Sequence, residues 1–203
     1  MREIDRHCGG LYGLADGCIV CTLAKTTWSG DREWSGGHRG RVRGMYQIEV
    51  REEIRAPIAA VFEALSDHER FFRGYGVKKS VVTTRGKTEK NGLGAIREID
   101  ALSFHFVEEV VAFERPTGFD YLIRRVTLFG RALPMEHERG WLELEARGGV
   151  TQIVWRSRFT LGVPVIGKYI AKAMAPQAQR AFAGLLRQAK RELEASVKTS
   201  AAS

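Results

Sequence analysis

The sequence predicts an α+β protein in which a curved antiparallel sheet closes around one long C-terminal helix. Residues 165–197 repeat apolar side chains in steps of three and four, which is typical of an amphipathic helix. From Met45 to that helix, the chain reads as short apolar or alternating runs separated by turn residues, which is typical of strands. The sheet and the helix each carry one apolar surface, so we expect each to cover the other.

The expected order is one strand, two small helices, about six more strands and the long helix. Residues 46–54 alternate as a half-buried strand does, and Ala56-Pro57 then opens a helix with proline in its first turn. Residues 130–134 are expected to form a loop, and Pro176 to kink or break the long helix. The later strands are expected at 77–84, 95–100, 104–114, 119–128, 137–146 and 151–161.

Residues 1–44 differ in kind from the rest, because they are rich in glycine and sustain neither the helical nor the strand periodicity of apolar residues. They hold all three cysteines, and Cys18 and Cys21 have the spacing of half a zinc knuckle that His7 and Cys8 would have to complete. No second close pair follows, so no metal is expected. We predict a poorly ordered extension over 1–44, a domain over 45–197 and a tail over 198–203. Translation starting at Met45 is a further hypothesis, because a strand begins on the next residue.

The net charge of +8 would suit acidic partners such as phospholipid head groups, RNA or anionic small molecules, but a soluble basic surface is the interpretation that we favour. No apolar run approaches the length of about 20 residues that a membrane-spanning helix needs. The sequence lacks zinc-finger spacing and any arginine–aromatic ladder, so no specific nucleic acid is expected. The absence of cysteine after Met45 fits a cytoplasmic protein.

Several short motifs resemble those of the START-like (SRPBCC) superfamily, in the branch described as polyketide cyclase/dehydrase and lipid-transport proteins. They are Ile54-Arg-Ala-Pro57 with Val61-Phe62 and Leu65-Ser-Asp67, then Phe113-Glu-Arg-Pro116, Gly148-Gly149 leading into 151–159, and the spacing of Phe182, Leu185, Leu186, Lys190, Leu193 and Glu194. The resemblance spans about 46–195. It implies a helix-grip fold, which is a seven-stranded antiparallel sheet around a long helix with an apolar cavity between them. Members bind lipids, sterols or polyketides, and some catalyse cyclisation or dehydration.

The candidate cavity residues are those expected on the inner faces of the strands and the helix. The apolar ones are Phe106, Tyr121, Ile123, Leu142, Trp155, Phe159, Met174 and Phe182, all of which could instead simply fill the core. Trp155 and Tyr121 are the strongest candidates, because each combines a large apolar body with a polar tip. The inward polar candidates are Glu52, Glu138 and Ser157, with Arg97 and Arg125 as partners. A Glu138–Arg125 pair would either orient a ligand or form an ion pair at the rim.

The sequence favours a binding protein over an enzyme. It contains no nucleophile elbow, metal-binding histidine pair or phosphate loop, and only His105 and His137 could act as bases in the strand region. We therefore expect a cytoplasmic monomer, without a cofactor, that binds or transports a hydrophobic small molecule such as a lipid or polyketide. One alternative is a cyclase or dehydratase that uses His or Glu. Another is an interaction module that touches an anionic membrane or a ribonucleoprotein through the basic helix face, formed by Lys168, Lys172, Arg180, Arg187 and Arg191.

Overall fold

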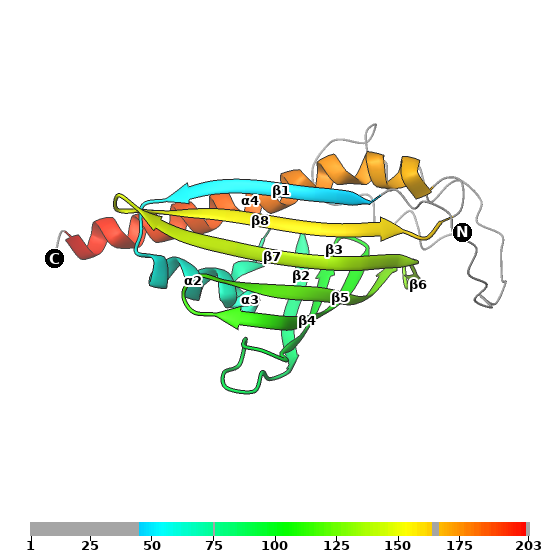
Figure 1. The fold of residues 1–203 in the computed structure, drawn as a ribbon, viewed down its shortest axis with the longest axis horizontal. Coiled ribbons are helices and arrows are strands. Elements are labelled where there is room, and N and C mark those ends of the chain that lie inside the picture. The colour runs from blue at the N-terminus through cyan, green and yellow to red at the C-terminus, as the bar shows by residue number, and fades with distance from the viewer. Residues whose placement is uncertain (1–44, 75, 164–166, 202–203) are drawn as a thin grey trace. The chain divides into compact units, whose positions relative to one another are not determined.

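The computed structural model describes residues 45–74, 76–163 and 167–201, and Figure 1 shows how their elements are arranged. The expected extension over 1–44, with its cysteines, lies outside the described residues. In chain order the elements are β1 (Tyr46–Ile54), α2 (Ile58–Ser66), α3 (His68–Phe71), β2 (Val77–Thr84), β3 (Ile96–Ala101), β4 (Phe104–Glu114), β5 (Gly118–Leu128), β6 (Arg131–Ala132), β7 (Met135–Arg147), β8 (Val150–Leu161) and α4 (Gly167–Ala201).

The strands form one antiparallel sheet in the order β1-β8-β7-β5-β4-β3-β2, and β6 pairs with β5. Seven strands therefore make the main path, as predicted, and the expected loop at 130–134 contains the short extra strand β6. Helix α4 packs mainly against β1 and also against β8 and α2. This arrangement is the helix-grip fold.

Helix α4 runs without a break through Pro176 and ends at Ala201 rather than at residue 197. Pro176 is exposed, so water can solvate the backbone carbonyl that loses its hydrogen-bond partner one turn earlier. Among the described residues, no helix combines the length and the apolar character needed to cross a membrane.

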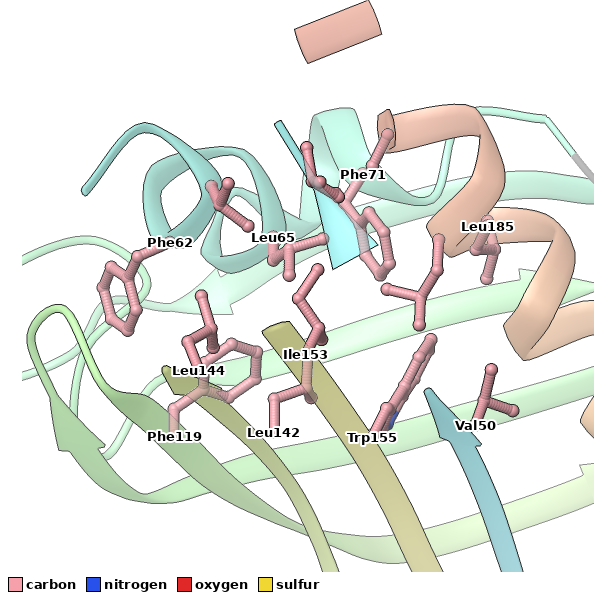
Figure 2. Packing of buried hydrophobic residues seen from close by; sticks show 14 of the residues in the cluster. Val50, Phe62, Leu65, Phe71, Phe119, Leu142, Leu144, Ile153, Trp155 and Leu185 are labelled. Carbon is pink, nitrogen blue, oxygen red and sulfur yellow. The ribbon is translucent and has the colours of Figure 1, made fainter. Parts of the chain in front are cut away.

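A cluster of buried apolar side chains lies where α2, α3 and α4 meet the inner face of the sheet. Figure 2 shows Trp155 of β8, Val50 of β1, Phe71 of α3 and Leu185 of α4 pointing toward one another. Alternation along each strand brings such residues to one face, and each large apolar side chain that is fully buried contributes about 1.5–3 kcal/mol. Burial here fixes how the helices sit on the sheet, and so positions the inner-face residues described next.

Candidate functional site

The inner face of the sheet is closed at one end and more open at the other. Near α2 and α3, side chains such as Ile153 are fully buried. Toward the end where β5 finishes and α4 begins, Phe106, Ile123 and Phe159 are only half-buried, and so is Phe182 of α4. This half-buried end, which we call the open end, offers apolar side chains that a hydrophobic ligand could contact.

A hydrogen-bonded polar cluster, formed by Tyr121, His137, Trp155 and Ser157, lies on the inner face next to this open end. The indole Nε1–H of Trp155 donates to the Tyr121 hydroxyl at 3.0 Å, and His137 Nε2 lies 3.0 Å from Ser157 Oγ. His137 Nδ1 accepts the backbone N–H of Ile123 at 3.0 Å. In the neutral ring, Nε2 therefore carries the proton and donates to Ser157. Burial lowers the pKa of His137 from 6.5 to about 4, so the ring is neutral at neutral pH.

The Tyr121 hydroxyl keeps its proton and can donate it. Burial raises the pKa of Tyr121 above its ordinary value, and hydrogen bonds with Trp155 and Ser157 offset that rise only in part. Trp155 can only donate, so the phenol oxygen acts as the acceptor in that bond. Ser157 Oγ is an acceptor within hydrogen-bonding reach of the phenol proton, and an oxygen atom of a ligand could take its place.

Two ring contacts hold the polar cluster in place. Phe182 of α4 stacks on Trp155 with ring centroids 3.8 Å apart and an angle of 14° between the planes. His137 stacks on Tyr121 with centroids 5.6 Å apart and an interplanar angle of 23°. Both contacts join residues that are distant in the sequence, so the orientation of the cluster depends on the position of α4 and on the pairing of β5, β7 and β8.

A buried ion pair lies beside the polar cluster. Arg97 Nη2 is 3.2 Å from Glu108 Oε2, and the two side chains are 1% and 8% exposed. The guanidinium of Arg97 also lies 5.8 Å from the centroid of the Tyr121 ring. Burial raises the pKa of Glu108 while Arg97 opposes that rise, and burial likewise lowers the pKa of Arg97. Each charge therefore depends on the other, in a site that disfavours either charge alone.

His68 of α3 lies in the same region and is 2% exposed. Its ring packs edge-on against Phe119, with centroids 5.5 Å apart, and neither ring nitrogen has a hydrogen-bond partner among the described residues. Burial, and to a lesser degree the charge of Arg97, hold the pKa of His68 well below its ordinary value. His68 is therefore a neutral, uncompensated polar group inside the core.

Most of the predicted pocket residues point inward. Tyr121, Leu142, Trp155 and Ser157 are buried on the inner face, and Phe106, Ile123, Phe159 and Phe182 are the half-buried residues at the open end. Met174 belongs to α4, and its side chain lies outside the described part of the structure. The part these residues play in binding a ligand stays a prediction.

The inward orientation predicted for Glu138 is wrong. Its side chain is 47% exposed and pairs with Arg158 at 3.4 Å rather than with Arg125. Glu138 is the extra residue of a β-bulge between the pairs His137–Phe159 and Arg139–Arg158. A bulge shifts the alternation by one residue, so His137 occupies an inward position instead of Glu138.

Glu52 and His105 lie apart from the polar cluster. Lys190 Nζ is 2.9 Å from Glu52 Oε1, so this pair links β1 to α4. Burial would raise the pKa of Glu52, but hydrogen bonds from Lys190 and from the backbone N–H of Glu53 outweigh that effect and lower it. His105 Nδ1 lies 2.6 Å from Asp100 Oδ1 on the β3–β4 hairpin.

Two surface notches lie near the opposite, closed end of the sheet. One, of about 240 Å³, is lined by Glu53, Arg55, Val150, Lys190 and Glu194. The other, of about 320 Å³, lies beside it around Arg55 and the β7–β8 turn. Neither is lined by an inner-face aromatic residue. Among the described residues, no group of three or more His, Cys, Asp or Glu side chains could hold a metal ion.

A sheet gripping a long helix, with an apolar inner face that leads to a polar cluster, defines a START-like domain for hydrophobic ligands. The chain belongs to the family described as polyketide cyclase / dehydrase and lipid transport, whose family model matches residues 45–194. A search of curated proteins finds no significant match to the sequence.

Solved structures share the fold at low sequence identity. A protein from Thermus thermophilus superimposes with a TM-score of 0.58 at 15% identity, covering 74% of this chain and 99% of its own. A START superfamily protein from Mycobacterium smegmatis gives 0.58 at 14% identity, with coverage of 74% and 99%. The Zhui aromatase/cyclase from Streptomyces sp. R1128 gives 0.57 at 16% identity, with coverage of 75% and 98%.

Proposed function

We propose that this protein binds, and carries, a hydrophobic small molecule that bears an oxygen acceptor, such as a lipid or a polyketide-like compound. One observation carries the proposal. The half-buried apolar residues Phe106, Ile123 and Phe159 lie on the same inner face as the Tyr121 hydroxyl, whose proton a ligand oxygen could accept in place of Ser157. Phe182 places α4 against the same site through its stack on Trp155.

The apolar contacts would supply the affinity, and the polar cluster would orient the ligand. Burial of apolar ligand surface stabilises a complex by about 25 cal/mol per Å². A single neutral hydrogen bond adds only about 0.5–1.5 kcal/mol, yet it decides which end of the ligand points inward. Tyr121 is suited to this part because Trp155 fixes the position of its oxygen.

The hydrogen bonds favour binding over cyclisation or dehydration. A general base needs a free nitrogen or carboxylate within reach of the substrate. Both ring nitrogens of His137 are already hydrogen-bonded, and Glu108 is paired with Arg97. The ring nitrogens of His68 have no hydrogen-bond partner within the described part of the chain, but His68 is only 2% exposed, within the aromatic core. The likeness to an aromatase/cyclase, at 16% identity, speaks for the fold alone.

A second candidate function is contact with an anionic membrane or a ribonucleoprotein through the basic helix face. Lys172, Arg180, Arg187 and Arg191 are exposed along α4, which supports this candidate. The side chain of Lys168 lies outside the described part of the structure. Strong salt dependence of partner binding would be its signature.

Native mass spectrometry of the protein from its own host, followed by organic extraction, is the first test of ligand binding. We expect a co-purifying hydrophobic mass that the extract identifies. Titration with 2-acetonaphthone and with 2-ethylnaphthalene then tests the polar cluster, because the two differ in one carbonyl oxygen. The ketone should bind about 2–10-fold more tightly, and Tyr121→Phe should remove that preference. The absence both of a co-purifying mass and of binding to either compound would refute the proposal.

A further inference from the structure

Two large apolar side chains project from neighbouring hairpin tips at the open end of the sheet. Leu102 lies in the turn between β3 and β4 and is 62% exposed, and Phe129 follows β5 and is 54% exposed. The Phe129 N–H donates to the carbonyl of Ser103 at 2.9 Å, so the two tips are tied together. Leu102 and Phe129 therefore form one exposed apolar feature, which we call the tip pair.

The backbone at both positions is unusual for these residue types. Leu102 has φ of 55° and Phe129 has φ of 51°, which is the left-handed region that Gly and Asn adopt readily and bulky residues rarely do. Leu102 rests partly against Gly76, where a Cβ would come within 2.9 Å of its Cδ2. A strained, exposed leucine and phenylalanine contribute little to the fold, so their presence indicates an interaction outside it.

Other exposed apolar residues gather at the same end of the molecule. The register pairs Tyr46 with Phe159, Met135 with Leu161 and Phe104 with Leu128, so the start of β1 and both hairpin tips share one end of the sheet. Figure 1 shows that α4 begins at that end too. Of the six large apolar residues that are exposed in the described part of the chain, four lie there: Met45, Leu102, Phe129 and Tyr169.

Basic side chains flank the tip pair. Lys78 and Lys79 lie at the start of β2, which pairs with β3 beside Leu102, and Arg131 lies in β6 just after Phe129. All three are exposed, and no ion pair with another described residue is recorded for them. The carboxylate of Asp100, close to Leu102 in the hairpin, is held by His105 at 2.6 Å. The charge around the tip pair is therefore positive, as is the net charge of +8.

From these observations we infer that the open end of the sheet docks on an anionic lipid bilayer, with Leu102 and Phe129 inserted among the lipids and Lys78, Lys79 and Arg131 facing the head groups. At the surface of an anionic bilayer, burial of apolar side chains and attraction of the surrounding basic side chains to the head groups both favour binding. Docking in this orientation presents the open end of the inner sheet face to the membrane. The inference does not require the proposed ligand-binding function to hold.

Sedimentation of the full-length protein with vesicles tests the inference. The vesicles are phosphatidylcholine alone, or phosphatidylcholine in which about a third of the lipid is replaced by anionic phosphatidylglycerol. We expect the wild type to bind the anionic vesicles, with binding weakened by added salt. The double variant Leu102→Asn with Phe129→Asn should bind about tenfold more weakly, because asparagine keeps the left-handed backbone and removes the apolar surface.

A stability measurement separates docking from folding. Because asparagine suits the left-handed backbone, the double variant should unfold at the same or a higher temperature while binding falls. Leu93→Asn is the matched control, since Leu93 is 40% exposed in the loop at the other end of β2 and β3 and should leave vesicle binding unchanged. Equal vesicle binding by wild type and double variant, or no binding by the wild type, would overturn the inference. So would a shift from dimer to monomer in the double variant, because the tip pair would then bind a second copy.

Discussion

The phenol ring of Tyr121 lies directly over Gly140 of the neighbouring strand. A Cβ at position 140 would come within 2.3 Å of the ring carbon Cζ. The two residues face each other in the β5–β7 register. The ring therefore crosses the sheet toward β8 over Gly140, which has no side chain. This placement brings the hydroxyl within reach of Trp155 Nε1–H.

Gly140→Ala should therefore displace the Tyr121 ring and destabilise the fold by about 1–3 kcal/mol, the usual cost of overpacking. Urea unfolding measures the loss. The matched comparison is the double-mutant cycle with Tyr121→Ala, in which the alanine at 140 should cost much less once the ring is gone. Additive effects would show that the ring and the glycine are not coupled.

Because the Arg97–Glu108 pair is buried, we predict that substituting Glu108 destabilises the protein much more than substituting its neighbour Glu109. Glu108→Gln leaves Arg97 buried without its counter-charge and should cost about 3–5 kcal/mol. Glu109→Gln is the control, because Glu109 pairs with Arg124 on the surface, at 34% and 52% exposure, and should cost less than about 1 kcal/mol.

The double variant Arg97→Met with Glu108→Met extends this test. It should be less destabilised than Glu108→Gln, because no buried charge is left unpaired. Chemical denaturation measures the unfolding free energy of each variant. Similar losses for Glu108→Gln and Glu109→Gln would contradict the burial of the pair.

Acid should destabilise the protein through His137. Its pKa is about 4 in the folded protein against an ordinary 6.5, because burial disfavours the charged ring. The unfolded chain therefore takes up the proton more readily. The stabilising contribution is fully present above pH 6.5 and is lost as the pH falls toward 4. The total loss from this residue is about 3 kcal/mol.

His137→Gln should flatten the pH dependence of the unfolding free energy across that window. Some dependence should persist, since the pKa of His68 is also depressed by burial and acts in the same direction. Denaturation curves measured at a series of pH values test this. An unchanged slope in His137→Gln would show that the ring is not buried in its neutral form.

The Phe182–Trp155 stack should hold the middle of α4 against the sheet. Phe182→Ala should cost about 2–3 kcal/mol, below the value for a fully buried phenylalanine because the ring is half-buried. Phe182→Leu keeps apolar bulk without a ring and should cost less. Thermal unfolding and tryptophan fluorescence report the change. If the alanine variant keeps wild-type stability, the stack does not fix the helix.

The strand alternation and the helical spacing, read from the sequence, predict the order of elements correctly. Val50, Trp155 and Leu185 lie on the expected faces because their periods match those of a strand and a helix. The same reasoning places Tyr121, Trp155 and Ser157 inward and identifies Arg97 as a possible partner for a buried carboxylate. It gives no sign that His68 is buried, since a histidine at the start of a short helix is ordinary on a surface.

The sequence by itself therefore determined the helix-grip architecture and most of the apolar inner face, because local periodicity encodes which side of each element is buried. Only the tertiary structure decided the polar contacts. The bulge at Glu138 turns His137 inward, Glu108 rather than Glu138 forms the buried pair with an arginine, and Gly140 makes room for Tyr121. Each of these depends on how two strands are paired, and the pairing register is a long-range property that the pattern of a single strand does not contain.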